Sequence, residues 1–217
     1  MPSQKSNCYR CGKTVSKSSA KRHCLSHSYT GEDSEIYRLV KIESVDIPDY
    51  WLYIAIRSNA VLGNLDTFLR AIWLECCGHM SVFYQNRYDE LAFEQKISDF
   101  SENTVLQYEY DFGDTTRLKI TFLETISLKA TQDKNPVILL LRNEPFAFEC
   151  QCGKPATYVC QECAWEETYP FYCDTCNKKH ERKQDHCSLP VVNSPRMCVC
   201  GYTGELDTYT FNPDDYT

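Results

Sequence analysis

Short apolar runs in the middle of the chain have the length and composition of β-strands. Residues 37–45 and 50–57 are rich in aromatic and β-branched side chains, which favours two strands. Residues 117–122 alternate between apolar and polar side chains, which predicts a strand with one face in water. Two further apolar runs, at 80–84 and 137–141, predict two more strands.

One segment between these runs has helical periodicity instead. Its apolar positions recur on one face of a helix and are Leu65, Phe68, Leu69, Ile72 and Trp73. Asn64 is a suitable N-cap for this helix and Gly78 is a suitable terminator. Together these elements predict an α+β fold, with a small mixed or antiparallel sheet and one main helix.

Cysteine departs most from an ordinary composition, with 14 residues among 217. No apolar stretch reaches the roughly 18 residues of a membrane span, so we expect no membrane association. The first residues lack the apolar core of a signal peptide, so we expect a cytoplasmic protein. Because thiols stay reduced in that compartment, we interpret the cysteines as metal ligands in preference to disulfide partners.

Charge and cysteine divide the chain into three parts. Residues 1–31 carry a formal charge of +6, residues 32–149 of −9 and residues 150–217 of −4. The cysteines gather in the first and last parts, and residues 28–34 have the small, polar composition of a linker. We therefore predict an N-terminal module, an α+β middle domain and a cysteine-rich C-terminal module with these boundaries.

The N-terminal module contains four residues at a metal-ligand spacing, namely Cys8, Cys11, His23 and His27. Two histidines four residues apart lie on one face of a helix, so both imidazoles can reach one ion. The pattern resembles a two-Cys two-His zinc finger, with Val15 and Ala20 at its core positions. Since that core is thin, we expect bound zinc to supply nearly all of the folding free energy.

The basic side chains of this module are candidates for contact with nucleic acid. Lys17, Lys21 and Arg22 could meet phosphates, and only Arg22 could make a bidentate contact with guanine. A finger that binds protein, or one that is purely structural, fits the sequence equally well. Cys24 is interpreted as a spare thiol, with replacement of a histidine ligand as the alternative.

The C-terminal module carries the strongest metal signal of the chain. Its candidate ligands are Cys150, Cys152, Cys160, Cys163, Cys173, Cys176, His180, His186, Cys187, Cys198 and Cys200. Successive ligand pairs on tight knuckles are typical of zinc modules. The pattern resembles a B-box or MYND cross-brace, and with the finger it predicts two to three zinc ions in the chain.

The cross-brace resemblance implies a specific pairing. Cys150 or Cys152 would share one ion with Cys173 and Cys176, and the pair 160/163 would share the other with the histidines. Several alternatives remain open in the sequence: sequential pairing of 160/163 with 173/176, one non-binding cysteine at 150 or 152, Cys187 in place of His186, and completion of a site by Cys198 and Cys200.

Three stretches of the middle domain carry a family resemblance. They are residues 50–54 (YWLYI), residues 62–69 with the strand at 78–83 (GHMSVF), and residues 108–114 (YEYDFGD) with Glu124 beyond. Through them the domain resembles the pRiA-type plasmid ORF-three-like family, also labelled insertion-element passenger proteins. The resemblance implies a small α+β fold and an association with mobile elements, without a defined activity. Thr115 and Thr116 stand where the family usually has a tryptophan.

Three functions are compatible with these patterns. The leading hypothesis is a non-catalytic zinc-binding adaptor with a protein partner. The alternative is a nucleic-acid-binding accessory of a mobile element that uses residues 1–31. The third is an enzyme built on His79, Asp111 and Asp114, although Asp and Gly there are equally typical of a turn. Because no nucleotide-binding or hydrolase motif is present, we assign no catalytic residue.

Three shorter segments carry expectations of their own. The adjacent Cys76 and Cys77 end the predicted helix and are interpreted as packing residues. Residues 193–202, with Arg196 among aromatic side chains, are expected to dock onto the middle domain. The acidic tail at 211–217 is expected to be loose.

Overall fold

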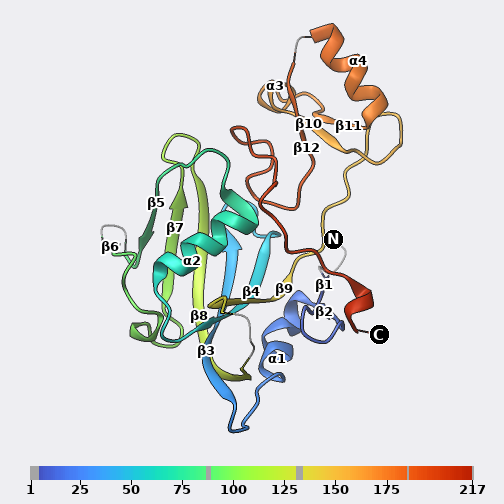
Figure 1. Ribbon diagram of the computed structural model, residues 1–217. Helices are drawn as coiled ribbons and strands as arrows, with labels where there is room; N and C mark the ends of the chain where they lie inside the picture. Colours follow the sequence, from blue (N-terminus) through green and yellow to red (C-terminus); the bar gives the residue numbers. More distant parts are fainter. Residues whose placement is uncertain (1–4, 87–88, 131–133, 185, 217) are drawn as a thin grey trace.

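A computed structural model of the chain describes residues 5–86, 89–130, 134–184 and 186–216. Its main body is a seven-stranded sheet in the order β6-β5-β7-β8-β3-β4-β9, and every neighbouring pair is antiparallel (Figure 1). The strands are β3 (Ser34–Ser44), β4 (Trp51–Arg57), β5 (Ser81–Tyr84), β6 (Glu90–Leu91), β7 (Val105–Tyr110), β8 (Thr116–Lys129) and β9 (Val137–Arg142). The α+β fold predicted from the sequence is confirmed, and its sheet is antiparallel.

The predicted helix lies across one face of this sheet. It consists of α2 (Leu62–Leu69) and a π-helical turn, η2 (Arg70–Leu74), with the short η3 (Ile97–Asp99) beside it. The predicted ends were wrong. Val61 is the N-cap, and its amide donates to Asn64 Oδ1 at 3.0 Å, so Asn64 supports the first turn from inside the helix. The helical hydrogen bonds end at Leu74, and Gly78 lies beyond them at φ 79°.

Strand β4, between β3 and the edge strand β9, is buried on both faces, as its unbroken apolar sequence requires. Leu52, Ile54 and Ile56 pack toward α2. Their neighbours along the strand, including Trp51 and Tyr53, pack on the opposite face of the sheet. By contrast β8 alternates between buried and exposed residues over its first half, which confirms the predicted strand with one wet face.

The N-terminal finger covers that opposite face. It consists of a hairpin of β1 (Lys5–Asn7) and β2 (Thr14–Ser16), the short η1 (Lys17–Ser19) and α1 (Ala20–Leu25). Val15 and Ala20 are buried together with Trp51 and Tyr53 of the sheet. The thin core of the finger is therefore completed by the middle domain. Burial against the sheet adds to whatever bound metal would contribute, and the expectation that zinc supplies nearly all of the finger's folding free energy stays a prediction.

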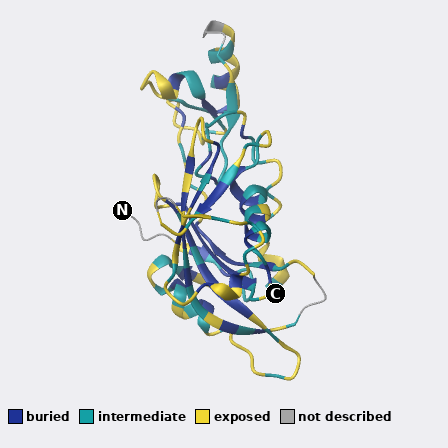
Figure 2. Ribbon diagram, turned by 90° about the vertical axis from the view of Figure 1, so that its left-hand side faces the viewer, coloured by how far each residue is buried: buried dark blue, intermediate teal, exposed yellow. Residues whose placement is uncertain are grey.

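The C-terminal module stands at one end of the body and projects from it (Figures 1 and 2). It contains β10 (Tyr158–Cys160), α3 (Gln161–Trp165), β11 (Phe171–Tyr172), α4 (Asp174–Gln184) and β12 (Ser188–Pro190), with strand order β11-β10-β12. Among the described residues of these elements, Val159 is the one apolar residue, apart from ligand cysteines, that is fully buried. The module therefore lacks an apolar core of its own.

The chain then returns along the body as the C-terminal segment (residues 191–216). Ser194 Oγ donates to the carbonyl of Trp73 at 2.6 Å, which confirms the predicted docking onto the middle domain. The segment ends in η4 (Pro213–Tyr216) beside the finger, where Tyr216 Oη donates to the Tyr9 carbonyl at 2.5 Å and the Phe211 ring packs against Tyr9. The expectation of a loose tail was wrong as far as residue 216.

Among the described residues, no helix is long and apolar enough to cross a membrane.

The docking of the finger predicts that substitutions on the two sides of α1 differ strongly in their effect on stability. Ala20 is fully buried against the sheet, whereas Arg22 on the same helix is exposed. We expect Ala20→Asp to lower the free energy of unfolding by about 3 kcal/mol, because it buries an unpaired carboxylate. The matched Arg22→Asp should change it by less than about 0.5 kcal/mol. Urea unfolding of the metal-loaded chain measures both, and equal stability of the two variants would contradict the packing.

Candidate metal centres

The structure gathers cysteines and histidines into four clusters, each with four ligand atoms within 4.8 Å of one another. The clusters are Cys8, Cys11, His23 and His27; Cys150, Cys152, Cys173 and Cys176; Cys160, Cys163, His180 and His186; and Cys76, Cys77, His79 and Cys200. We refer to them as the finger, tetrathiol, mixed and junction clusters. Each could hold a metal ion.

Ligand separations in the finger cluster match a tetrahedral ion. Around zinc, tetrahedral edges are about 3.8 Å between two sulfurs, about 3.5 Å between sulfur and nitrogen, and about 3.3 Å between two nitrogens. Cys8 Sγ lies 3.2 Å from His27 Nε2, and Cys11 Sγ lies 3.5 Å from His23 Nε2. The two Nε2 atoms are 3.3 Å apart. The four predicted residues of the finger therefore face one point.

In the C-terminal module the ligands interleave along the chain. The tetrathiol cluster joins the first and third predicted pairs, and the mixed cluster joins the second pair to two histidines. This is the cross-brace arrangement, not the sequential one. Cys152 Sγ and Cys173 Sγ are 3.7 Å apart, and Cys160 Sγ is 3.5 Å from His186 Nδ1. Both Cys150 and Cys152 belong to the tetrathiol cluster, and His186, not Cys187, completes the mixed one.

Local electrostatics favour the metal-binding forms of several ligands. Burial lowers the pKa values of His23, His27 and His180, so their imidazoles are neutral at pH 7. Backbone amides at Cys152 and Cys173 donate to Cys150 and lower the pKa of its thiol to about 6. Neutral imidazole and thiolate are the forms that coordinate metal.

Three other thiols lie outside the four clusters. Cys187 is exposed. Burial raises the pKa of the Cys198 thiol to about 11, so it stays protonated at pH 7. Cys24 is fully buried in the apolar layer between finger and sheet, and burial raises its pKa as well. Cys24 is thus a packing residue, as expected of a spare thiol, and the structure does not place Cys187 or Cys198 with other ligands.

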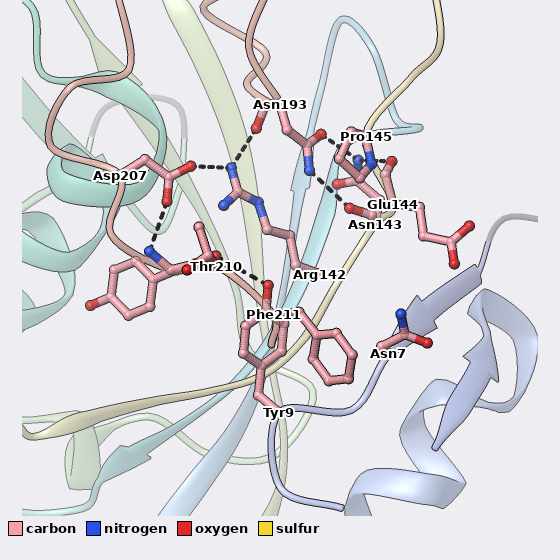
Figure 3. Close-up of a pocket in the computed structure, with 11 residues that line it drawn as sticks. Asn7, Tyr9, Arg142, Asn143, Glu144, Pro145, Asn193, Asp207, Thr210 and Phe211 are labelled. Atoms are coloured by element: carbon pink, nitrogen blue, oxygen red, sulfur yellow. Dashed lines mark hydrogen bonds and ion pairs between the residues drawn. The ribbon is translucent and has the colours of Figure 1, made fainter. Parts of the chain in front are cut away.

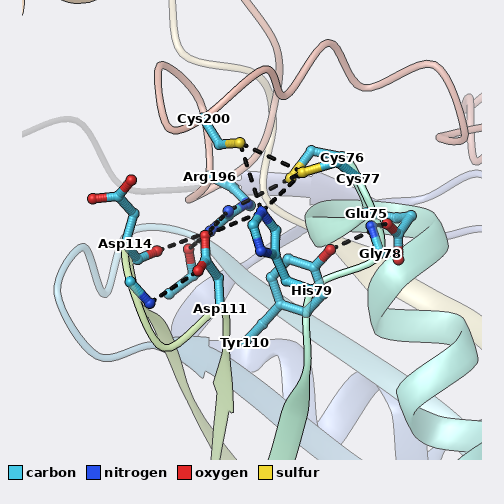
Figure 4. Close-up of polar contacts among 12 residues, drawn as sticks. Glu75, Cys76, Cys77, Gly78, His79, Tyr110, Asp111, Asp114, Arg196 and Cys200 are labelled. Carbon is cyan, nitrogen blue, oxygen red and sulfur yellow. Dashed lines mark hydrogen bonds and ion pairs between the residues drawn. The ribbon is translucent and has the colours of Figure 1, made fainter.

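The junction cluster contains three residues that were not predicted as ligands. Cys76, Cys77 and His79 lie in the loop between η2 and β5, and Cys200 approaches them from the C-terminal segment (Figure 4). Cys76 is half-buried and packs against the main core, as interpreted, whereas Cys77 is exposed, so the interpretation as a packing residue was wrong for Cys77. The Cys-Cys-x-His spacing was the available signal, but its fourth ligand lies more than a hundred residues away.

The carboxylates considered for catalysis have other roles in the structure. Asp111 Oδ2 lies 3.4 Å from His79 Nε2 and accepts a hydrogen bond from Arg196 Nη2 at 2.5 Å. Burial alone would raise the pKa of Asp111, but hydrogen bonds from Arg196 and backbone amides hold it below the usual value. The side chain of Asp114 points away from this pair (Figure 4). The three side chains therefore do not converge on one reacting point.

Two of the three cations considered for phosphate contact are paired within the chain. Lys17 Nζ lies 3.2 Å from a Glu43 carboxylate oxygen, and Lys21 Nζ lies 2.8 Å from Glu124. Both acids belong to the sheet on which the finger rests. Arg22 is exposed. The positive charge of the finger is thus partly neutralised by the acidic middle domain.

A hollow of about 410 Å³ lies between the finger, the end of β9 and the C-terminal segment (Figure 3). Arg142, only 6% exposed, donates to the Asn193 carbonyl at 2.6 Å and pairs with Asp207 at 2.7 Å. Tyr9 donates to the Tyr209 carbonyl at 3.2 Å across the same space. These contacts tie the C-terminal segment to the body.

Comparison with known proteins adds little to this geometry. No family model matches the chain, and no curated protein matches it. Among solved structures, the chain is similar to a protein of unknown function, MM3350 from Methanosarcina mazei Go1. The two share 18% sequence identity and a TM-score of 0.42, over 49% of this chain and 69% of the other.

The tetrathiol cluster yields a direct test of metal dependence in the C-terminal module. We expect Cys173→Ser to remove one metal ion per chain and to unfold α4, because the module has almost no apolar core without it. Cys187→Ser is the matched control, since its thiol lies outside the clusters, and it should keep both the ion and the helix. Metal analysis and far-UV circular dichroism measure these outcomes. An intact α4 in metal-free Cys173→Ser would contradict the account.

Proposed function

We propose that this chain is a non-catalytic zinc-binding adaptor whose zinc ions shape two modules on an α+β body. The observation that carries the proposal is the ligand set of the finger, tetrathiol and mixed clusters. Each offers four thiolate or imidazole ligands from the protein, and four such ligands close a tetrahedral shell. A closed shell leaves no position for a reacting water, which is the mark of structural zinc.

The identity of the ion follows from ligand chemistry. Sets of sulfur and nitrogen ligands in tetrahedral arrangement suit zinc better than magnesium or calcium, which prefer oxygen. The thiols must stay reduced to bind it, and this supports the expected cytoplasmic location.

The surface of the C-terminal module supports a protein partner. Trp165, at the end of α3, is 78% exposed although the neighbouring Cys163 is buried. Trp165 is the most exposed large apolar side chain among the described residues, and tryptophan is enriched among the residues that anchor protein interfaces. The module also projects from the body, so a partner could reach it without displacing the sheet (Figure 1).

The alternative function is nucleic-acid binding by an accessory protein of a mobile element. The exposed Arg22 and the resemblance of residues 108–114 to the pRiA-type plasmid family support it. The ion pairs of Lys17 and Lys21 count against it, because these cations are already neutralised. The enzyme hypothesis ranks last, since Asp111 is engaged by Arg196 and Asp114 points away.

The adaptor proposal is tested on the full chain isolated under reducing conditions without chelator. Native mass spectrometry should find bound zinc and a stoichiometric protein complex. Trp165→Ala should abolish the complex, whereas Tyr29→Ala, at an exposed aromatic residue of the linker, should retain it. The proposal fails if the complex survives Trp165→Ala. It is replaced by the alternative if an oligonucleotide co-purifies and its binding weakens with salt and with Arg22→Ala.

A further inference from the structure

The junction cluster joins two parts of the chain that are far apart in sequence. Cys76, Cys77 and His79 follow the helical layer of the middle domain, and Cys200 belongs to the C-terminal segment. We propose that these four residues bind a further zinc ion, which fastens the C-terminal segment over the buried Asp111–Arg196 pair. This site goes beyond the three clusters of the proposed function, because none of its ligands belongs to them.

The ligand geometry supports an ion. Cys77 Sγ lies 3.7 Å from Cys76 Sγ and 3.6 Å from Cys200 Sγ, close to the tetrahedral edge of about 3.8 Å for two zinc-bound sulfurs. His79 Nε2 is 3.6 Å from Cys200 Sγ and 2.9 Å from Cys77 Sγ. The two sulfurs of a disulfide are about 2.05 Å apart, so these separations are too long for a disulfide bond.

The charges around the cluster also suit a thiolate-bound zinc. Three thiolates and one Zn²⁺ carry a net charge of −1, which needs a nearby cation in a partly buried place. Arg196 is the cation beside the thiolates, although it shares its charge with Asp111: its side chain is completely buried, and Nη2 lies 3.5 Å from Cys76 Sγ. The same nitrogen binds Asp111 Oδ2 at 2.5 Å, which keeps that carboxylate from competing as a fifth ligand. Hydrogen bonds of this kind orient and stabilise metal ligands.

The loop that carries the first three ligands is rigidly supported. Arg70 donates to Glu75 at 2.7 Å and to the carbonyl of His79 at 2.8 Å, and its guanidinium lies 4.8 Å from the centre of the Tyr110 ring. Glu75 in turn accepts from the amide of Gly78 at 2.5 Å. The ligands are therefore presented in place by contacts that do not involve an ion.

The fourth ligand is positioned by the C-terminal module. Gln161 Nε2 donates to the carbonyls of Cys198 and Cys200, at 3.0 and 2.6 Å. Gln161 lies between Cys160 and Cys163 of the mixed cluster, so the same short helix serves both sites. Cys200 also has a positive φ of 52°. This backbone conformation is unfavourable for residues other than glycine, and it is found where the surrounding structure holds the residue in place.

The proposal is tested by counting zinc on the full chain. Native mass spectrometry should find one zinc fewer in Cys200→Ala than in the unaltered chain. His79→Ala, in the other half of the site, should lose one zinc as well. Cys198→Ala is the matched control, because its thiol lies in the same loop but outside the cluster, and it should keep the full number.

A second readout reports the fastening of the segment. Trypsin cleaves after arginine, and the complete burial of Arg196 protects it in the folded chain. We expect cleavage at Arg196 in Cys200→Ala and none in Cys198→Ala under the same conditions. Far-UV circular dichroism of both variants checks that the sheet is intact.

The outcomes separate this site from the proposed function. If Cys200→Ala and His79→Ala keep the full zinc number, the junction site is wrong even when the other clusters are filled. If instead Cys11→Ser and Cys173→Ser lose no zinc while Cys200→Ala does, the proposed function fails and the junction site stands.

Discussion

The structure depends on burying both faces of β4. A strand with apolar side chains on both faces cannot sit at the surface of a two-layer fold, because one row of large side chains would face water. The helix α2 covers one face, and the finger covers the other with Val15 and Ala20 above Trp51. The finger that carries metal ligands therefore also covers one face of the sheet in the middle domain.

The parts that lack an apolar core carry ligand clusters that could hold metal, together with buried arginines. The C-terminal module replaces such a core with two interleaved ligand sets. The C-terminal segment is tied to the body by Arg142 with Asp207 and by Arg196 with Asp111. Buried ion pairs of this kind add little net stability but are costly to break. They therefore specify one position for the segment.

Much of this architecture could be predicted from local sequence, and the exceptions share a cause. The finger and cross-brace ligands stand in pairs with characteristic spacing, so each set shows in the sequence. The junction ligands do not, because Cys200 and His79 are brought together only by the path of the C-terminal segment. In the same way, the burial of Ala20 depends on the sheet. The helix start is a different, local case: Asn64 accepts from the amide of Val61, three residues earlier, instead of capping the helix itself.

The central claim is that metal ions shape the peripheral parts, including the finger over β4, while β7 and β8 are supported by the helical layer. Hydrogen–deuterium exchange on the metal-loaded and chelator-treated chain tests it most directly. The account predicts that chelation removes protection from α1, α3 and α4, while the paired strands β7 and β8 keep theirs. Equal protection of α4 with and without metal, or simultaneous loss throughout the sheet, would contradict it.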